Sequence, residues 1–204
     1  LATRAIAGAA PRAEMNPEEI VVMARLGQKA GAIDEGELAV IQNILSVRTR
    51  TVREIMTPRS VVFTLDADAT IEETSKSERL YFHSRVPVYV GSRDEIVGVV
   101  YRRDILAAIA EGKLDQHVRA FVKPVYFVPT VVRLDDLLER FLERRQHLFV
   151  VINEFNEFSG VVTLEDVLEE ILGAEIVDEF DEAVDMQELA RRRRDQAAGR
   201  MKAT

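Results

Sequence analysis

The 204-residue sequence contains no cysteine and only three histidines, at positions 83, 117 and 147. The missing cysteines exclude disulfide bonds and thiolate metal sites, and they are compatible with a reducing compartment. The spacing of the histidines matches no metal-ligand motif. No apolar run approaches the ~18 residues of a membrane span, and no secretory signal pattern is present. With 47% hydrophobic residues, the chain is expected to be a soluble globular protein of one or two domains with a sizeable core.

Basic charge is missing from one long segment of the chain. Residues 165–188 hold eleven of the 35 acidic residues and none of the 27 basic ones, which leaves 24 acidic against 27 basic residues elsewhere. This charge pattern is more typical of a solvated segment whose carboxylates repel one another than of a direct cation-binding site. The chain also lacks the basic stripe with interleaved aromatics that binds nucleic acid. The one basic run, Arg191–Arg194, falls in a polar tail at 183–204 and is interpreted as solvated or membrane-adjacent.

Helix signals dominate the first 50 residues. Asn16 is a predicted N-cap, followed by Pro17 at the first helical position, and Gly31 marks the stop. A second helix is predicted from Asp34 and Glu37, which form a capping-box pattern. Its apolar positions fall on one predicted face: Leu38, Ile41, Ile44 and Leu45. These are two short amphipathic helices that need a surface to pack on.

The remainder of the sequence repeats one unit. "GVVYRRDILAAI" at 98–109 returns as "GVVTLEDVLEEI" at 160–171, and each copy reads as a βαββα module. We expect repeats at 51–113 and 114–182, because one module of about 60 residues buries too little surface alone and should pack sheet to sheet on the other. The predicted fold is α+β with approximate twofold symmetry and two related clefts. The predicted helices and strands lie at 70–82, 85–90, 95–100, 133–145, 147–152 and 158–162.

Three groups of residues offer binding chemistry. Thr163 stands where a strand meets a helix, and Asp166 follows on the first turn, so an anion and two vicinal hydroxyls could bind there; an ordinary capping box is the alternative. Arg85 offers a forked cation for phosphate, or is simply solvated. Pro87 stiffens the strand that follows, and Thr57 is held extended by Pro58.

Taken together, the motifs "VREIMTPRSVVFTLDADATIEE", "HSRVPVY" and "GVVTLEDVLEEILGAEIVDEFD" resemble the paired cystathionine-β-synthase (CBS, or Bateman) domains of the cyclin M and CorB/CorC family of magnesium transport proteins. The resemblance covers about residues 50 to 182. It implies a cytoplasmic regulatory module that dimerises through its CBS pairs and binds ATP with Mg²⁺. Residues 1–50 resemble the helical segment that joins this module to an N-terminal transmembrane domain.

The resemblance also implies roles for individual residues. Thr57 would border the adenine or ribose, His83 and Arg85 would face the nucleotide, and Asp166 would hold the ribose hydroxyls. The implied cofactor-binding set is Thr57, His83, Arg85, Val86, Pro87, Thr163 and Asp166, with Val86 and Pro87 as the apolar wall and Thr163 on phosphate or ribose. No catalytic or metal-ligating residues are implied.

The second cleft departs from this pattern. Tyr101 replaces the small hydroxyl of Thr163 and would crowd a phosphate beside Asp104, so this cleft is predicted to be empty or poorly selective. The hairpin "NEFNEFSG" at 153–160 also lacks the glycines that many relatives carry there.

Two other functions remain to be weighed. A dimerisation scaffold whose cleft binds nothing is the alternative to a nucleotide sensor. An enzyme is not expected, because the sequence has no P-loop and no nucleophile paired with a base.

Overall fold

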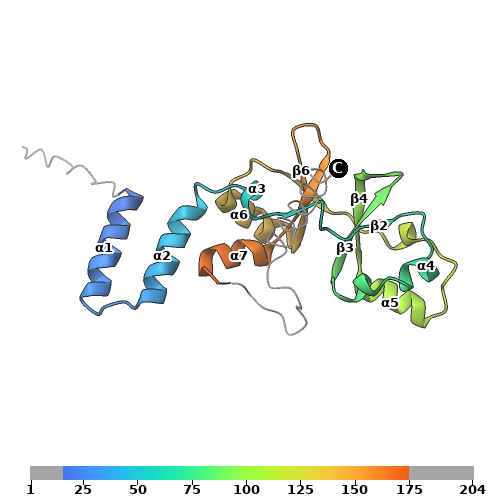
Figure 1. The fold of residues 1–204 in the computed structure, drawn as a ribbon, viewed down its shortest axis with the longest axis horizontal. Helices are drawn as coiled ribbons and strands as arrows, with labels where there is room; N and C mark the ends of the chain where they lie inside the picture. The colour runs from blue at the N-terminus through green and yellow to red at the C-terminus, as the bar shows by residue number, and fades with distance from the viewer. Residues whose placement is uncertain (1–15, 175–204) are drawn as a thin grey trace, which may run out of the picture.

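The two helices predicted ahead of the repeats form a hairpin at one end of the molecule (Figure 1). The computed structural model describes residues 16–174, so the tail at 183–204 and most of the acidic segment lie outside the described residues. Helix α1 spans Pro17–Lys29 and α2 spans Glu35–Val47. Both begin with reciprocal capping boxes, which satisfy backbone N–H groups that have no partner inside the helix. The box of Asp34 with Glu37 was predicted, whereas for Asn16 only the N-cap was predicted and its box with Glu19 is an addition.

Helix α2 packs on two sides, against α1 and against the last helix, α7 (Leu164–Leu172). Val47 at its end is buried, whereas Ile44, on the predicted apolar face, is 50% exposed. The packed surfaces are set by the two neighbouring helices, and the apolar stripe in the sequence is wider than the surface they cover.

Two sheets follow the hairpin, one in each lobe of the molecule. The first lobe contains the three-stranded sheet, and the second lobe contains the four-stranded sheet. Their orders are β1-β7-β6-β5 and β2-β3-β4. Strands β2 and β3, like β5 and β6, run parallel, and the other pairs are antiparallel. The strands are β1 Thr57–Pro58, β2 Leu65–Asp66, β3 Arg85–Val90, β4 Ser92–Tyr101, β5 Tyr126–Pro129, β6 Leu148–Ile152 and β7 Phe158–Thr163.

Helices cover the outer face of each sheet. The remaining helices are α3 Val52–Ile55, α4 Ile71–Ser75, η1 Glu78–Tyr81, α5 Arg102–Ala110, η2 Val118–Phe121 and α6 Leu134–Arg144. The single helix expected at 70–82 is two short pieces, because α4 ends at Ser75 and a 3₁₀ turn begins at Glu78. The helix expected at 133–145 is present as α6.

Three apolar clusters hold these layers together. One lies between the four-stranded sheet and its helices, where the rings of Phe141 and Phe149 stack with centroids 4.0 Å apart. A second lies between the three-stranded sheet and its helices. The third joins the sheets themselves and consists of Ile96, Val99, Leu148, Val150, Phe158 and Val161. The predicted sheet-to-sheet packing of two α+β repeats is thereby confirmed.

Each repeat sends its leading segment into the other lobe. Val52 and Ile55 are buried in the core of the second lobe, and β1 pairs with β7. In the same way, Val118 is buried in the core of the first lobe, and Lys123 pairs with Val99 of β4. The two lobes therefore exchange their leading segments and pack as one unit.

This exchange explains the glycine that opens both copies of the "GVV" motif. A side chain at Gly160 would overlap the carbonyl oxygen of Thr57, and one at Gly98 would overlap the carbonyl oxygen of Lys123. Only glycine lets the crossing backbone come this close to the strand.

The hairpin between β6 and β7 forms without the glycines. Asn156 adopts the left-handed conformation, with φ 61°. The side-chain oxygen of Asn153 accepts hydrogen bonds from the backbone N–H groups of Phe155 and Glu157, both at 2.9 Å. Asparagine tolerates the left-handed conformation, as at Asn156, and its side chain can hydrogen-bond to the backbone of the turn, as at Asn153. The turn therefore forms without glycine.

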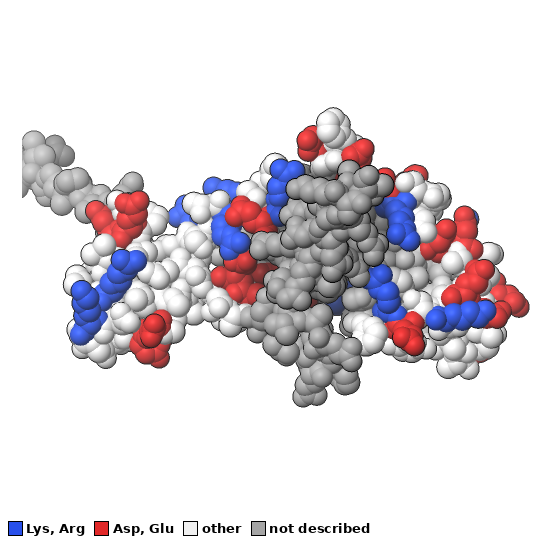
Figure 2. Space-filling model, viewed as in Figure 1, with Lys and Arg blue, Asp and Glu red and all other residues white. Residues whose placement is uncertain are grey.

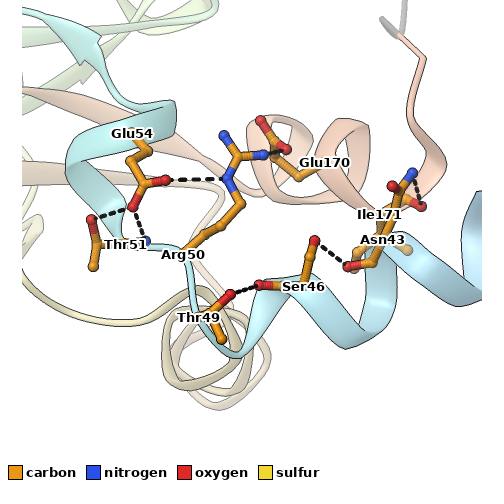
Figure 3. Close-up of polar contacts among 8 residues, drawn as sticks. All are labelled: Asn43, Ser46, Thr49, Arg50, Thr51, Glu54, Glu170 and Ile171. Carbon is orange, nitrogen blue, oxygen red and sulfur yellow. Dashed lines mark hydrogen bonds and ion pairs between the residues drawn. The ribbon is translucent and has the colours of Figure 1, made fainter. Parts of the chain in front are cut away.

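The helical hairpin is tied to the second lobe through α7 (Figure 3). The guanidinium of Arg50 pairs with the carboxylates of Glu54 and Glu170. The side-chain amide of Asn43 donates to the carbonyl of Ile171 at 3.3 Å. These contacts and the burial of Val47 fix α2 against the helix that carries Thr163 and Asp166.

Candidate functional site

Thr163 and Asp166 form a complete capping box at the start of α7. The Thr163 hydroxyl accepts from the N–H of Asp166 at 3.2 Å, and the Asp166 carboxylate accepts from the N–H of Thr163 at 2.6 Å. The capping role that the sequence left open is therefore present. The bond from the Thr163 N–H is accepted by Oδ2 of Asp166.

Asp166 is an unusual carboxylate. Loss of solvent around the partly buried side chain raises its pKa to about 7, and the negative charges of Glu169 and Glu165 push in the same direction. Hydrogen bonds to the carboxyl from the backbone and the side chain of Thr163 oppose this rise. A carboxyl group near half-ionisation at neutral pH is typical of binding and catalytic sites, although structural networks also produce it.

Thr57 lies next to this helix start. It is paired with Val161 on β7, two residues before Thr163. Val161 belongs to the cluster between the sheets, and Val162 belongs to the core under the helices. Because side chains alternate along a strand, Thr163 shares the inner face of its sheet with Val161.

Arg85 and Pro87 lie on the inner face of the opposite sheet. Tyr89, two residues beyond Pro87, packs on the cluster between the sheets, and Val88 is buried in the core of the first lobe. By the same alternation, Arg85 and Pro87 point toward the second repeat. The sequence-predicted residues thus come from two facing sheets, and Arg85 and Thr163 both lie on inner faces.

Val86 is the exception among the predicted residues. Its side chain has 0% exposure and is part of the first-lobe core. It lies on the opposite face of β3 from Pro87 and contributes no side-chain wall to a cleft between the repeats. Only its backbone is available on the inner side. His83 precedes the strand and lies with its ring centroid 6.0 Å from that of Phe63.

The second helix start is built differently. Tyr101 occupies the N-cap position of α5 without a side-chain capping bond, and Asp104 is paired with Arg103 at 3.5 Å. The Tyr101 ring lies beneath two guanidinium groups, those of Arg85 and Arg103. The sequence predicted that Tyr101 would crowd this cleft, but it gave no sign of the contact with Arg85, since the register of β3 on β4 brings the two together.

A groove of about 260 Å³ lies at the hairpin ends of the two sheets. Its floor is apolar, with Ile96, Val150 and Phe158, and its rim carries Asp94, Glu95 and Glu157. Arg59 reaches Asp94 at 2.5 Å and the carbonyl of Phe158 at 3.4 Å, so it links the two lobes here. Sequence reasoning missed this role, because residues 59 and 94 lie far apart in the chain.

Between residues 16 and 174, no group of three or more His, Asp or Glu side chains is arranged to hold a metal ion. Within the same range, no helix has both the length and the apolarity needed to span a bilayer.

Comparison with known proteins gives matches to a family model, to a curated relative and to solved structures. The CBS domain family model matches residues 52–111 and 118–173. A curated relative, "UPF0053 protein sll1254" of Synechocystis, is 37% identical over 179 residues, covering 88% of this chain and 51% of the relative. The chain thus spans about half the length of that relative.

Solved structures cover the repeats closely. The structure of the CBS domain of the bacterial CNNM/CorC family Mg²⁺ transporter is 39% identical, with a TM-score of 0.74, and the match covers 80% of this chain and 99% of that one. A structure of the same description in complex with ATP is 41% identical, with a TM-score of 0.64, over 68% of this chain and 98% of that one.

Proposed function

Because this chain belongs to the CBS-domain family, as a CBS pair of the CNNM/CorC Mg²⁺ transporters, we propose that it binds ATP together with Mg²⁺ between its two repeats and so regulates an attached transport domain. The observation that carries the proposal is the pairing of Thr163 and Asp166 at the start of α7, on the inner face of its sheet. The related CBS domain solved with ATP supports the choice of ligand.

The proposed cleft combines groups that suit a nucleotide. The N-terminus of α7 presents backbone N–H groups and the positive end of the helix dipole, which favour phosphate. The Asp166 carboxylate would accept from a ribose hydroxyl, and Arg85 would pair with phosphate from the facing sheet. Thr57, His83 and Pro87 would border the base and sugar, together with the backbone of Val86.

Mg²⁺ enters the proposal through electrostatics. ATP carries about four negative charges, and Glu165 and Glu169 lie close enough to Asp166 to raise its pKa. Free ATP would be repelled by these carboxylates, and Mg²⁺ bound to its phosphates would remove about half of its charge. The cation would be held mainly by the phosphates. Mg²⁺ is therefore expected to raise the affinity for ATP.

Calorimetric titration of ATP with and without Mg²⁺ tests this site. Asp166→Ala should weaken MgATP binding about 10- to 100-fold, because it removes a charged hydrogen-bond acceptor. Asp104→Ala is the matched control in the second cleft and should leave the affinity unchanged. Equal affinities for the wild type and Asp166→Ala would refute the assignment, and so would equal losses in both variants.

A scaffold that binds no nucleotide is the second candidate. It is favoured by the completeness of the Thr163–Asp166 capping box, which gives both residues a structural role without a ligand. Thermal melting separates the two functions, since a ligand at 100 times its dissociation constant stabilises a fold by about 2.7 kcal/mol. No change in melting temperature at millimolar MgATP would favour the scaffold. Multiple turnovers of ATP on long incubation would instead indicate an enzyme.

We further propose that the module lies on the cytoplasmic face of a membrane, joined through residues 1–50 to a transmembrane domain, and acts as a homodimer. Helix α1 has no buried residue. Val22, Met23 and Leu26 are 56%, 60% and 60% exposed, an apolar surface suited to a further protein contact. Light scattering on the purified chain should give twice the monomer mass of 23.0 kDa; a monomer at all concentrations would contradict the dimer.

A further inference from the structure

Tyr101 and Arg85 form a direct cross-strand pair. They are opposite each other in the antiparallel ladder of β3 and β4. The N–H of Arg102 donates to the carbonyl of Ser84 at 3.0 Å, one residue beyond the pair. Residues 85 and 101 therefore occupy a non-hydrogen-bonded position, where facing side chains lie closest together.

The contact between the two side chains has the geometry of a cation–π interaction. The guanidinium carbon of Arg85 lies 5.8 Å from the centroid of the Tyr101 ring. That of Arg103 lies 4.9 Å from the same centroid. Arg103 is 81% exposed and also pairs with Asp104, whereas Arg85 is partly buried. Arg85 is therefore the guanidinium that contacts the ring on the inner side of the sheet, while Arg103 remains at the surface.

A long cation that is already held in one place binds an anion at a lower cost in side-chain entropy. Arginine loses up to about 2 kcal/mol of side-chain entropy when it is fixed, and a ring that restricts it beforehand reduces the loss on binding. A threonine at position 101 could not do this, because it has no aromatic face. Tyr101 and Thr163 stand at equivalent helix starts, and the contact with Arg85 links the Tyr101 helix start to the cleft proposed near Thr163.

We propose that Tyr101 is a positioning residue for the nucleotide cleft, acting by holding the Arg85 guanidinium in place for a phosphate group. The inference rests on the proposed function, since the phosphate belongs to the nucleotide bound near Thr163. In this arrangement Thr163 meets the ligand itself, and Tyr101 acts only through Arg85.

Two substitutions at Tyr101 separate the effect of the aromatic ring from the effects of side-chain size and of the hydroxyl group. Tyr101→Phe keeps the ring, and Tyr101→Leu keeps an apolar side chain without it. With MgATP, Tyr101→Leu should weaken binding about 2- to 5-fold, the range of an exposed cation–π contact, and Tyr101→Phe should bind as the wild type. Adenosine, which has no phosphate, should bind both variants equally. Arg103→Gln is the matched control and should leave the MgATP affinity unchanged.

A double-mutant cycle identifies the residue through which Tyr101 acts. In an Arg85→Gln background, Tyr101→Leu should cause no further loss of MgATP affinity. An equal loss of adenosine and MgATP binding would show a merely structural role for Tyr101 and overturn the inference. A loss that persists without Arg85 would do the same.

A measurement without nucleotide tests the positioning role of Tyr101 independently of the proposed nucleotide binding. The NMR resonance of the Arg85 side-chain Nε–Hε group should be shifted by the ring in the wild type and in Tyr101→Phe, and should move toward the free value in Tyr101→Leu. If it does not move, the positioning role is refuted whatever the nucleotide does. If it moves but no nucleotide binds the wild type, the proposed function fails, and with it the role of Tyr101 in phosphate binding.

Discussion

Asp166→Asn should abolish a specific pH dependence of stability. Burial raises the pKa of Asp166 from 3.8 to about 7, so the folded state holds this proton more tightly than the unfolded chain does. The neutral carboxyl therefore stabilises the fold at low pH, and this contribution is lost as the pH rises from about 4 to about 7. A shift of about three pKa units at ~1.4 kcal/mol each sets a ceiling of about 4 kcal/mol.

The assay is urea unfolding followed by circular dichroism at pH values from 4 to 8. The asparagine side chain can still accept the Thr163 N–H bond but cannot ionise, so the substitution removes the titration and keeps the cap. The free energy of unfolding of the wild type, relative to Asp166→Asn, should fall between pH 4 and pH 7 and then level off.

Glu73→Gln provides the control in a matched capping box. Thr70 and Glu73 cap α4 as Thr163 and Asp166 cap α7, but hydrogen bonds from Thr70 lower the pKa of the exposed Glu73. Its contribution is present above its unfolded pKa of about 4.5 and is lost only at lower pH. Relative to Glu73→Gln, wild-type stability should be constant from pH 5 to pH 8. A constant difference between the wild type and Asp166→Asn over the whole range would refute the reasoning.

Other substitutions test the crossing segments and the link to the helical hairpin. Gly160→Ala should cost roughly 2 kcal/mol or more of unfolding free energy and should also weaken MgATP binding, because the new Cβ displaces the Thr57 backbone. Gly98→Ala should destabilise similarly by displacing Lys123, and unchanged stability in either variant would contradict the close approach. For Arg50 and Glu170, both partly exposed, a double-mutant cycle in urea should give a coupling of about 0.5–1 kcal/mol, and no coupling would show that the pair does not hold α2.

Local chemistry made much of the candidate site predictable. The start of α7 was evident because a threonine followed three residues later by a carboxylate satisfies N–H groups within one turn. The strand at Arg85–Val90 matched its predicted bounds, since a short apolar run with proline and β-branched residues favours extended backbone. The direction of the Val86 side chain could not be settled, because a strand buried on both faces shows no alternation.

The sequence by itself determined the helix caps and the position of Thr163 and Asp166 on one turn, because each depends on residues a few positions apart. It also determined the duplicated unit, because the two copies share a residue pattern. The tertiary structure alone decided that residues 52–58 pack in the second lobe, that Gly98 and Gly160 admit a crossing chain, and that Tyr101 faces Arg85. These features depend on which strands become neighbours. The strand neighbours are determined by the burial of apolar residues over the whole core, so they cannot be predicted from any short stretch of residues.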